Sequence, residues 1–328
     1  MTANAADRLI QHYVDNFRQL PWRTPPGELA SDPYPVWLSE VMLQQTTVAT
    51  ARPRFERFLA RWPTIEALAA ARDEEILHEW AGLGYYARAR NLIVCARRVV
   101  ERGGFPRSAA ELRQLPGIGA YTSAAIAAIA FGERAAAIDT NVERVLSRLC
   151  GLRNPKRSEL ELILLDMLPA DFPGDLVQAM MDLGATICRS ANPSCAECPL
   201  RQDCVAFANK NPGDYPSRQA RAARPHKHGV AFWIERSSSI WLVRRPTRGL
   251  LGGMAALPGG TWDEPGRPSM DLIGTVRHVF SHFSLDLHLV RRCEPSQDGW
   301  WQPLDRLDEA ALPTLYRKAI GKALSSDD

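Results

Sequence analysis

The chain has 328 residues, 45% of them hydrophobic and 23% charged, and a formal net charge of +3. This length is typical of two domains, and the hydrophobic share is enough to bury a core in each. No apolar run approaches ~18 residues, which excludes a membrane-spanning helix, and the N-terminal segment lacks the pattern of a signal peptide. We therefore expect a cytoplasmic protein.

The N-terminal part of the chain is predicted to be helical. Residues 1 to about 20 form an amphipathic pattern, and a largely apolar helical segment starts at Val36 and contains Glu40. Glu40 has two interpretations. The residue pattern alone favours a glutamate on the solvent face of the helix. The alternative is a partly buried carboxyl group whose raised pKa suits a general acid near neutral pH.

A turn rich in glycine and tyrosine, GLGYYARARNL, spans residues 82–92 and follows two predicted helices over 55–80. Its glycines let a partner approach the backbone closely. Tyr85 is suited to stacking on or wedging between bases, and Arg88 to meeting a phosphate. An ordinary turn between helices, with its tyrosines packed underneath, explains the same pattern equally well.

The stretch from 115 to 145, LPGIGAYTSAAIAAIAFGERAAAIDTNVERV, combines a turn, a small-residue helix and a carboxylate. Gly117 and Gly119 allow a tight turn with outward-pointing N–H groups, and the helix that begins near Ala120 adds its positive end. Together these features predict an anion site, of which phosphate is the usual occupant. Asp139 then stands just before the next helix, where it can serve as an N-cap or as a catalytic carboxylate.

Four of the seven cysteines lie within one short segment with the spacing C-x6-C-x2-C-x5-C. Such crowding in a cytosolic chain indicates a metal site rather than disulfides. The wide arms around a single C-x2-C pair favour a [4Fe–4S] cluster, with zinc as the alternative. The predicted ligands are Cys188, Cys195, Cys198 and Cys204.

The sequence pattern changes from helical to extended after a proline-rich and basic segment, residues 206–228, which is predicted to be a linker. Strands are expected over 229–236, 239–245, 272–280 and 283–292, followed by a helix over 311–324. The fold class is therefore multidomain. An all-α domain, residues 1–205, precedes a small α+β domain, residues 229–328.

The order and spacing of LPGIGAYT, Asp139 and the cysteine segment resemble the endonuclease III superfamily of helix-hairpin-helix DNA glycosylases. The segments SEVMLQQT, GLGYYARARNL and QAMMDLGA, with FSH at 280–282, resemble the MutY-type adenine DNA glycosylases within it. The resemblance covers nearly the whole chain. It implies a glycosylase domain with a [4Fe–4S] loop at 188–204, a Nudix-like second domain, and Glu40 as the general acid.

Further site residues follow from this resemblance. It implies that Asp139 stabilises positive charge on the sugar and that Tyr121 and Asn141 support it. Thr140 departs from the family, which commonly has glycine at this position. The residues matched to contacts with DNA or the extruded base are Arg23, Leu43, Gln45, Tyr85, Arg88, Gly117, Gly119 and Gln178.

Tyr121 separates this chain from the endonuclease III branch, which has a nucleophilic lysine at the same position of the hairpin. A phenol forms no Schiff base, so we expect base removal without efficient strand cleavage. Phe280, Ser281 and His282 match a loop that contacts 8-oxoguanine. A strand end capped by polar residues is the alternative for this trio. The Nudix-like domain shows no glutamate-rich Mg²⁺-binding helix, so we interpret it as a recognition module.

The resemblance implies a monofunctional hydrolase that acts on duplex DNA and removes adenine opposite 8-oxoguanine or guanine. We expect a monomer associated with the nucleoid and with no membrane partner. A thymine-specific or oxidised-pyrimidine-specific glycosylase of the endonuclease III type is the alternative enzyme. A DNA-binding protein without catalysis is a third possibility, which the retention of both Glu40 and Asp139 disfavours.

Overall fold

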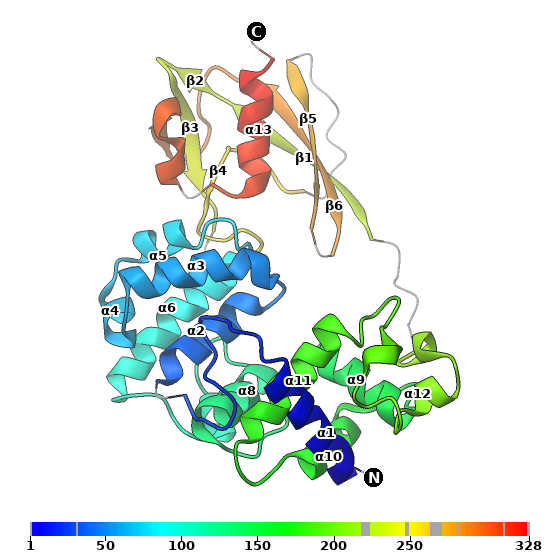
Figure 1. Ribbon diagram of the computed structural model, residues 1–328. Helices are drawn as coiled ribbons and strands as arrows, with labels where there is room; N and C mark the ends of the chain where they lie inside the picture. Colours follow the sequence, from blue (N-terminus) through cyan, green and yellow to red (C-terminus); the bar gives the residue numbers. More distant parts are fainter. Residues whose placement is uncertain are drawn as a thin grey trace. The chain divides into compact units, whose positions relative to one another are not determined.

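The computed structural model describes residues 2–30, 32–217, 224–246, 249–262, 271–280, 282–310 and 312–326. The chain divides into two compact units (Figure 1). The first consists of residues 1–71 and 91–220, and the second of residues 72–90 and 221–328. Within the described residues, no helix combines the length and the apolarity needed to cross a bilayer.

The first unit is helical, as the sequence predicts. Its helices, together with α5, which the second unit includes, and α6, which crosses the boundary, have the following bounds: α1 Thr2–Asp15, α2 Pro33–Leu43, α3 Val48–Arg61, α4 Ile65–Ala70, α5 Asp73–Glu79, α6 Tyr86–Glu101, α7 Ala109–Leu112, α8 Ala120–Phe131, α9 Thr140–Cys150, α10 Arg157–Met167, α11 Pro173–Thr186 and α12 Val205–Ala208. Short 3-10 turns, η1 Cys195–Glu197 and η2 Pro212–Asp214, complete it.

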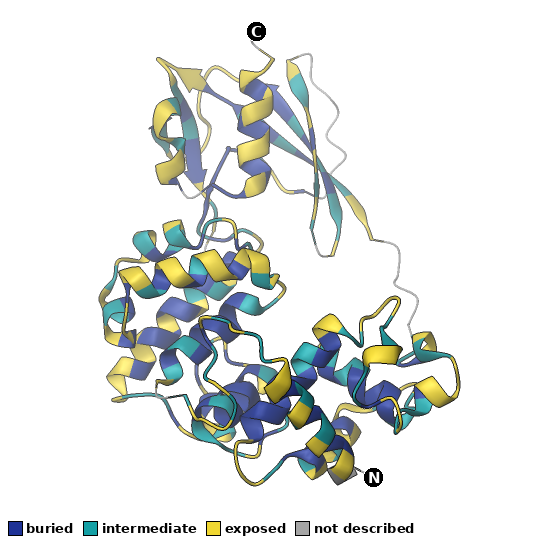
Figure 2. Ribbon diagram, in the orientation of Figure 1, coloured by how far each residue is buried: buried dark blue, intermediate teal, exposed yellow. Residues whose placement is uncertain are grey.

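Helix α8 forms the centre of this unit, and α2, α7 and α11 pack against it. Its alanine- and isoleucine-rich sequence makes this burial possible, because small side chains admit neighbouring helices on nearly every side (Figure 2). Helix α11 approaches α9 closely at Gly184, where an added Cβ atom would lie 2.6 Å from Cβ of Asn141. The glycine therefore fixes the distance between α11 and the start of α9.

The first half of the predicted linker is part of the first unit. Ala206 on α12 and Tyr215 after η2 are buried, and the backbone N–H of Ser217 donates to the carbonyl of Arg153 at 2.6 Å. Burial of these two side chains holds this half of the segment on the first unit, although its proline-rich composition predicts a linker. Of the remaining part, residues 218–223 lie outside the described residues.

The second unit contains two small sheets and helix α13, with the α+β character that the sequence predicts. Its described elements are β1 His226–Trp233, β2 Glu235–Arg236, β3 Ser239–Arg244, β4 Ala255–Ala256, β5 Leu272–Val279, β6 Ser284–Arg291, β7 Trp300–Pro303, the 3-10 segment η3 Leu304–Ala310 and α13 Thr314–Leu324. The sequence does not predict β4 and β7, because each is too short to show an alternating pattern.

One sheet has the order β1-β6-β5, in which β1 runs parallel and β5 antiparallel to β6. In the other, β3 pairs with β2, β4 and β7. Residues alternate between buried and half-buried along β1 and β6, so one sheet face supplies the core and the other is partly open to solvent (Figure 2). Helix α13 covers the core face by packing against β5 and β6.

Candidate active site

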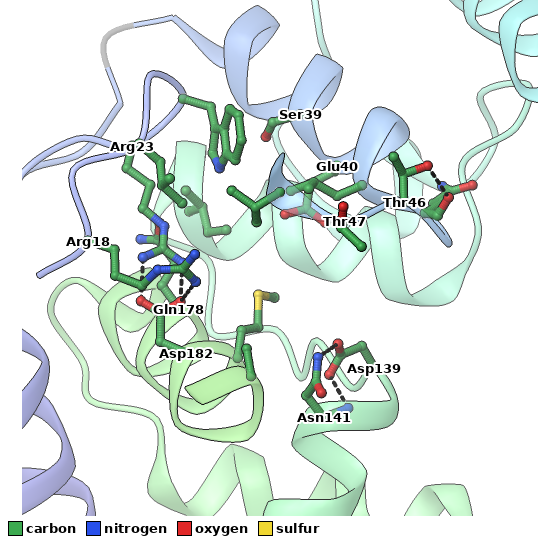
Figure 3. A pocket seen from close by; sticks show the side chains of 18 of the residues that line it. Arg18, Arg23, Ser39, Glu40, Thr46, Thr47, Asp139, Asn141, Gln178 and Asp182 are labelled. Carbon is green, nitrogen blue, oxygen red and sulfur yellow. Dashed lines mark hydrogen bonds and ion pairs between the residues drawn. The ribbon is translucent and has the colours of Figure 1, made fainter. Parts of the chain in front are cut away.

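A pocket of about 760 Å³ in the first unit is lined by one side of α2, the start of α9, residues of α8 and α11, and the loops at 18–23 and 44–47 (Figure 3). It brings together eight of the side chains singled out in the sequence, although they are spread over nearly half of the chain. They are Arg23, Glu40, Leu43, Gln45, Tyr121, Asp139, Asn141 and Gln178. Since these residues come from separate elements, only the tertiary fold places them around one cavity.

Glu40 is buried, with only 7% of its surface exposed. The solvent-face interpretation is therefore wrong, because α2 is enclosed by its neighbours all along its length from Val36 to Met42. The pKa of the Glu40 carboxyl is raised from 4.5 to about 7, mainly by burial and in part by the negative charge of Asp139. The hydrogen bond from Tyr121 and the positive charge of Arg23 lower this pKa. A large part of this carboxyl group is thus protonated at neutral pH.

Asp139 is the N-cap of α9 and is only half-buried. Its Oδ1 accepts hydrogen bonds from the backbone N–H groups of Asn141 at 2.9 Å and Val142 at 2.7 Å, while Oδ2 accepts from the Asn141 side-chain amide at 2.9 Å. The capping role and an electrostatic role are compatible, because capping holds the carboxylate at the pocket wall. Thr140 occupies the first helical position without disturbing this cap.

Asn141 is itself held in place by Arg144, one turn further along α9. Arg144 donates to Oδ1 of Asn141 at 2.7 Å and to the backbone carbonyls of Gly184 at 2.7 Å and Cys188 at 2.8 Å. Its guanidinium therefore connects the amide that contacts Asp139 with the end of α11 and the first residue of the cysteine segment. The orientation of Asn141 depends on this connection.

Tyr121 lies in the first turn of α8, and burial raises the pKa of its phenol well above 10. The nearby carboxylates of Glu40 and Asp139 act in the same direction. Its hydroxyl donates to Sδ of Met181, a weak acceptor, at 3.7 Å and also interacts with the Glu40 carboxyl. Tyr121 is therefore a neutral donor in the pocket at all physiological pH values.

Two further pocket residues, Arg18 and Asp182, were not singled out from the sequence. Asp182 accepts hydrogen bonds from both nitrogens of the Arg23 guanidinium at 2.5 and 2.9 Å, and from Arg18 at 2.9 Å (Figure 3). Asp182 lies four residues after Gln178, so the two side chains share one face of α11. This spacing could have identified Asp182 as a pocket residue from the sequence. Asp182 thus places a carboxylate against the guanidinium of Arg23, whose side chain is only 7% exposed.

Gln45 and Tyr85 share an unusual backbone conformation. Both have positive φ angles, 57° for Gln45 after α2 and 45° for Tyr85 before α6, and both side chains are exposed. Non-glycine residues rarely adopt this region, and such strain is concentrated at functional sites. Tyr85 belongs to the second unit, where Arg88 folds back over its ring at 5.4 Å and donates to the carbonyl of Leu83 at 2.9 Å.

The hairpin before α8 has the geometry expected of an anion site. Gly117 has a φ angle of 77°, and an added Cβ atom would lie 2.6 Å from Cβ of Asn91. Gly119 is exposed and forms the N-cap of α8 without a side-chain cap, so the first N–H groups of the helix are available to a ligand. Position 117 therefore accepts only glycine, whereas position 119 has open space around it.

The four cysteines of the C-x6-C-x2-C-x5-C segment line one small cavity together with Arg148. Arg148 donates to Sγ of Cys188 at 3.4 Å, and its backbone carbonyl accepts from the Cys204 thiol at 3.4 Å. Burial raises the pKa of the Cys198 thiol to about 11, so a thiolate there requires a bound cation. Four soft sulfur donors around one cavity beside a guanidinium fit an iron–sulfur cluster.

The predicted FSH loop is the turn between β5 and β6. Phe280 stacks on Trp262 with a centroid distance of 5.6 Å and packs against Phe283 at 4.8 Å, whereas His282 is exposed. Ser281 lies outside the described residues. The turn is thus anchored by its phenylalanines and presents His282 to solvent.

Comparisons with known proteins agree with this architecture. Residues 38–170 match the HhH-GPD superfamily base excision DNA repair proteins, and residues 230–322 match the NUDIX domain. The chain is 35% identical to an adenine DNA glycosylase of Rattus norvegicus, covering 95% of this chain and 76% of that protein. It is 38% identical to an adenine DNA glycosylase of Buchnera aphidicola subsp. Baizongia pistaciae, covering 92% of each.

Among solved structures, the chain is similar to a thermostable thymine-DNA glycosylase, with 27% identity, a TM-score of 0.57, and coverage of 62% of this chain and 95% of that one. It is also similar to an endonuclease III trapped as a covalent intermediate with DNA, with 26% identity, a TM-score of 0.54, and coverage of 63% and 95%. These likenesses agree with the helical fold of the first unit. The chain belongs to the adenine DNA glycosylase family.

Proposed function

We propose that this protein hydrolyses the N-glycosidic bond of adenine opposite 8-oxoguanine or guanine in duplex DNA. One observation carries the proposal: Glu40, Tyr121 and Asp139 line a single pocket in which the carboxyl group of Glu40 has a pKa of about 7. A buried acid beside an accessible carboxylate is the pair that this reaction requires, since one protonates the leaving base and the other stabilises the sugar cation.

In the proposed reaction, the adenine is first extruded from the duplex into the pocket. Protonated Glu40 delivers its proton to N7, which turns the base into a better leaving group. Departure of the base leaves cationic character at C1′ of the sugar. The side chain of Asp139 stabilises this charge, and the Asn141 amide holds its Oδ2 oxygen in place. Water then completes the hydrolysis.

Tyr121 limits the reaction to base removal. Because its phenol stays neutral and forms no Schiff base, the enzyme lacks the amine that would attack C1′ and cleave the strand. We propose that Tyr121 instead donates a hydrogen bond to Glu40 and thereby sets the protonation of the acid. Arg23, Leu43 and Gln178 contact the extruded base.

We assign DNA binding to three features, of which Arg88 is half-buried and the other two are exposed. Gln45 and Tyr85 enter the base stack at the lesion, in keeping with their exposed side chains and left-handed backbone. Gly117 and Gly119 bring backbone N–H groups to a phosphate at the start of α8. Arg88 contacts a phosphate after turning away from the ring of Tyr85.

We further propose that Phe280, Ser281 and His282 read the base opposite the adenine. The packing of Phe280 against Trp262 supports a rigid turn that presents the exposed His282. This gives a catalytic domain of residues 1–205 and a recognition domain of residues 229–328. Residues 206–228 join them, although the first half of this segment packs on the catalytic domain.

For the cysteine segment we propose a [4Fe–4S] cluster held by Cys188, Cys195, Cys198 and Cys204. Among the described residues, the side chains that approach closely enough for a single ion do not include these cysteines, which supports a larger cluster over zinc. The cluster would hold the segment from 188 to 204 in shape beside α9. The proposed setting is a monomer in the cytoplasm, bound to nucleoid DNA.

The test uses labelled duplexes with adenine opposite 8-oxoguanine, adenine opposite guanine, and thymine opposite guanine, each incubated with enzyme and then treated with alkali. We expect alkali-labile sites at adenine in the first two duplexes and no strand cleavage before alkali. Glu40→Gln should bind the duplex but abolish excision, whereas Glu56→Gln, an exposed carboxylate change on α3, should not. Cleavage only at thymine would support the alternative glycosylase, and no cleavage would refute the proposal.

A further inference from the structure

The partly solvated face of the β1-β6-β5 sheet carries a group of histidines that the glycosylase reaction does not use. His226 and His228 project from β1, and Asp286 lies directly opposite His228 on β6. The ligand atoms of these three side chains lie within 4.8 Å of one another. Among the described residues, this is the one group of three or more His, Cys, Asp or Glu side chains close enough to share an ion.

We propose that His226, His228 and Asp286 form a binding site for a divalent transition-metal ion of the zinc class. Imidazole and carboxylate groups are the donors that zinc prefers, with metal–ligand distances of about 2.0–2.2 Å. Nε2 of His226 already lies 3.1 Å from Oδ2 of Asp286, a separation that suits two ligands of one tetrahedral ion. The rings of His226 and His228 have centroids 4.8 Å apart, so a small side-chain rotation completes the group.

The surrounding hydrogen bonds prepare these ligands for a metal. Nδ1 of His226 lies 2.7 Å from Oγ of Ser284, which leaves Nε2 free to face Asp286. Pairing of the second ring nitrogen is a general feature of metal-binding histidines, because it fixes the tautomer and the ring orientation. Arg277 donates to Oδ1 of Asp286 at 2.9 Å and, at the longer distance of 3.4 Å, to Oδ2, whose shorter contact is with Nε2 of His226 at 3.1 Å. Since Arg277 is 68% exposed, solvent screens its repulsion of the ion.

The site would connect two strands that are distant in sequence, because its ligands lie at the start of β1 and on β6. A metal there would stabilise the folded second unit, since the unfolded chain does not hold the three ligands together. His288 stacks on His228 at 5.8 Å and pairs through Nδ1 with Oγ1 of Thr275, but it does not belong to the group of side chains whose ligand atoms lie within 4.8 Å of one another. We therefore assign three protein ligands and leave the remaining positions to water.

The test is a titration of the full-length protein with Zn²⁺, followed by calorimetry and by metal analysis after desalting, with iron content measured in parallel. We expect one zinc per chain at unchanged iron and a higher unfolding temperature. Asp286→Asn or His228→Ala should abolish this binding. Ser284→Ala should weaken it roughly 10-fold or more by removing the partner of His226.

Thr275→Ala is the matched control, because it removes a hydroxyl from the same sheet face but from a histidine that is not a ligand. It should leave zinc affinity unchanged. Equal affinity in the wild type and Asp286→Asn would overturn the proposal, as would equal weakening by Ser284→Ala and Thr275→Ala. Zinc uptake that rises only as iron is lost would assign the ion to the cysteines and would also overturn it.

Discussion

Raising the pH should switch off base excision as Glu40 loses its proton. With the ordinary pKa of 4.5, roughly one carboxyl group in 300 would be protonated at pH 7, whereas with the pKa of about 7 that burial produces, about half are. The protonated form is the active one, so the single-turnover excision rate should be highest below pH 7. Above that value it should fall about tenfold per pH unit.

The assay is single-turnover excision of adenine opposite 8-oxoguanine between pH 5.5 and 9, quenched in alkali. Tyr121→Phe removes a group that lowers the pKa of Glu40, so its profile should move to higher pH. Glu56→Gln, which changes an exposed carboxylate, should keep the wild-type profile. A rate that is flat from pH 6 to 9, or a Tyr121→Phe profile displaced to lower pH, would refute the role of Glu40 as the acid.

The raised pKa of Glu40 also predicts that the free energy of unfolding changes with pH, which can be measured without an activity assay. Because the folded-state pKa of Glu40 is raised, its stabilising contribution is complete at low pH and is lost as the pH rises through about 7. Ionised Glu40 should therefore cost about 3 kcal/mol at pH 8.5, a penalty that Glu40→Gln avoids. Thermal unfolding should show Glu40→Gln above the wild type at pH 8.5 and close to it at pH 4.5.

Three further changes test other parts of the site. Tyr121→Lys places an amine in the pocket and should produce strand nicking without alkali; background nicking would mean that position 121 does not by itself decide the lyase step. Gly117→Ala should cost about 2 kcal/mol or more, because its φ angle of 77° and its crowded surroundings exclude a Cβ atom, while Gly119→Ala should change stability little in the same denaturation assay. Cys198→Ser should bleach the broad absorbance expected near ~400 nm from an iron–sulfur cluster, and a colourless wild type purified without oxygen would instead favour zinc.

Much of the architecture follows from local sequence alone. The 3.6-residue and 2-residue hydrophobic periods place α2, α8, α9, α13 and the longer strands within a few residues of their observed bounds, because each period records which face of an element is buried. The expectation of two helices over 55–80 is wrong, since this region holds three helices, α3 to α5, and α3 already begins at Val48. Asp139 was expected to cap a helix, and it does so through two backbone N–H groups. The turn at Gly117 likewise follows from the left-handed conformation that glycine adopts most readily.

The tertiary structure decided whether Glu40 is exposed or buried. Its local pattern favoured the solvent face, and only the packing of other helices around α2 buries it and raises its pKa. Composition likewise predicted a linker from residue 206, but burial of Tyr215 keeps this segment on the first unit.

The pocket itself could not be predicted from any one segment, because its walls are brought together by contacts between distant helices. Asp182 illustrates the reason. Its partners Arg18 and Arg23 lie about half the chain away in sequence, and no local period records such a pairing. The sequence by itself thus determined the elements, the turn at Gly117 and the cap at Asp139. The tertiary structure decided which side chains share a cavity and how far the pKa of Glu40 is raised. Both depend on burial and charge, which come from neighbours that are remote along the chain.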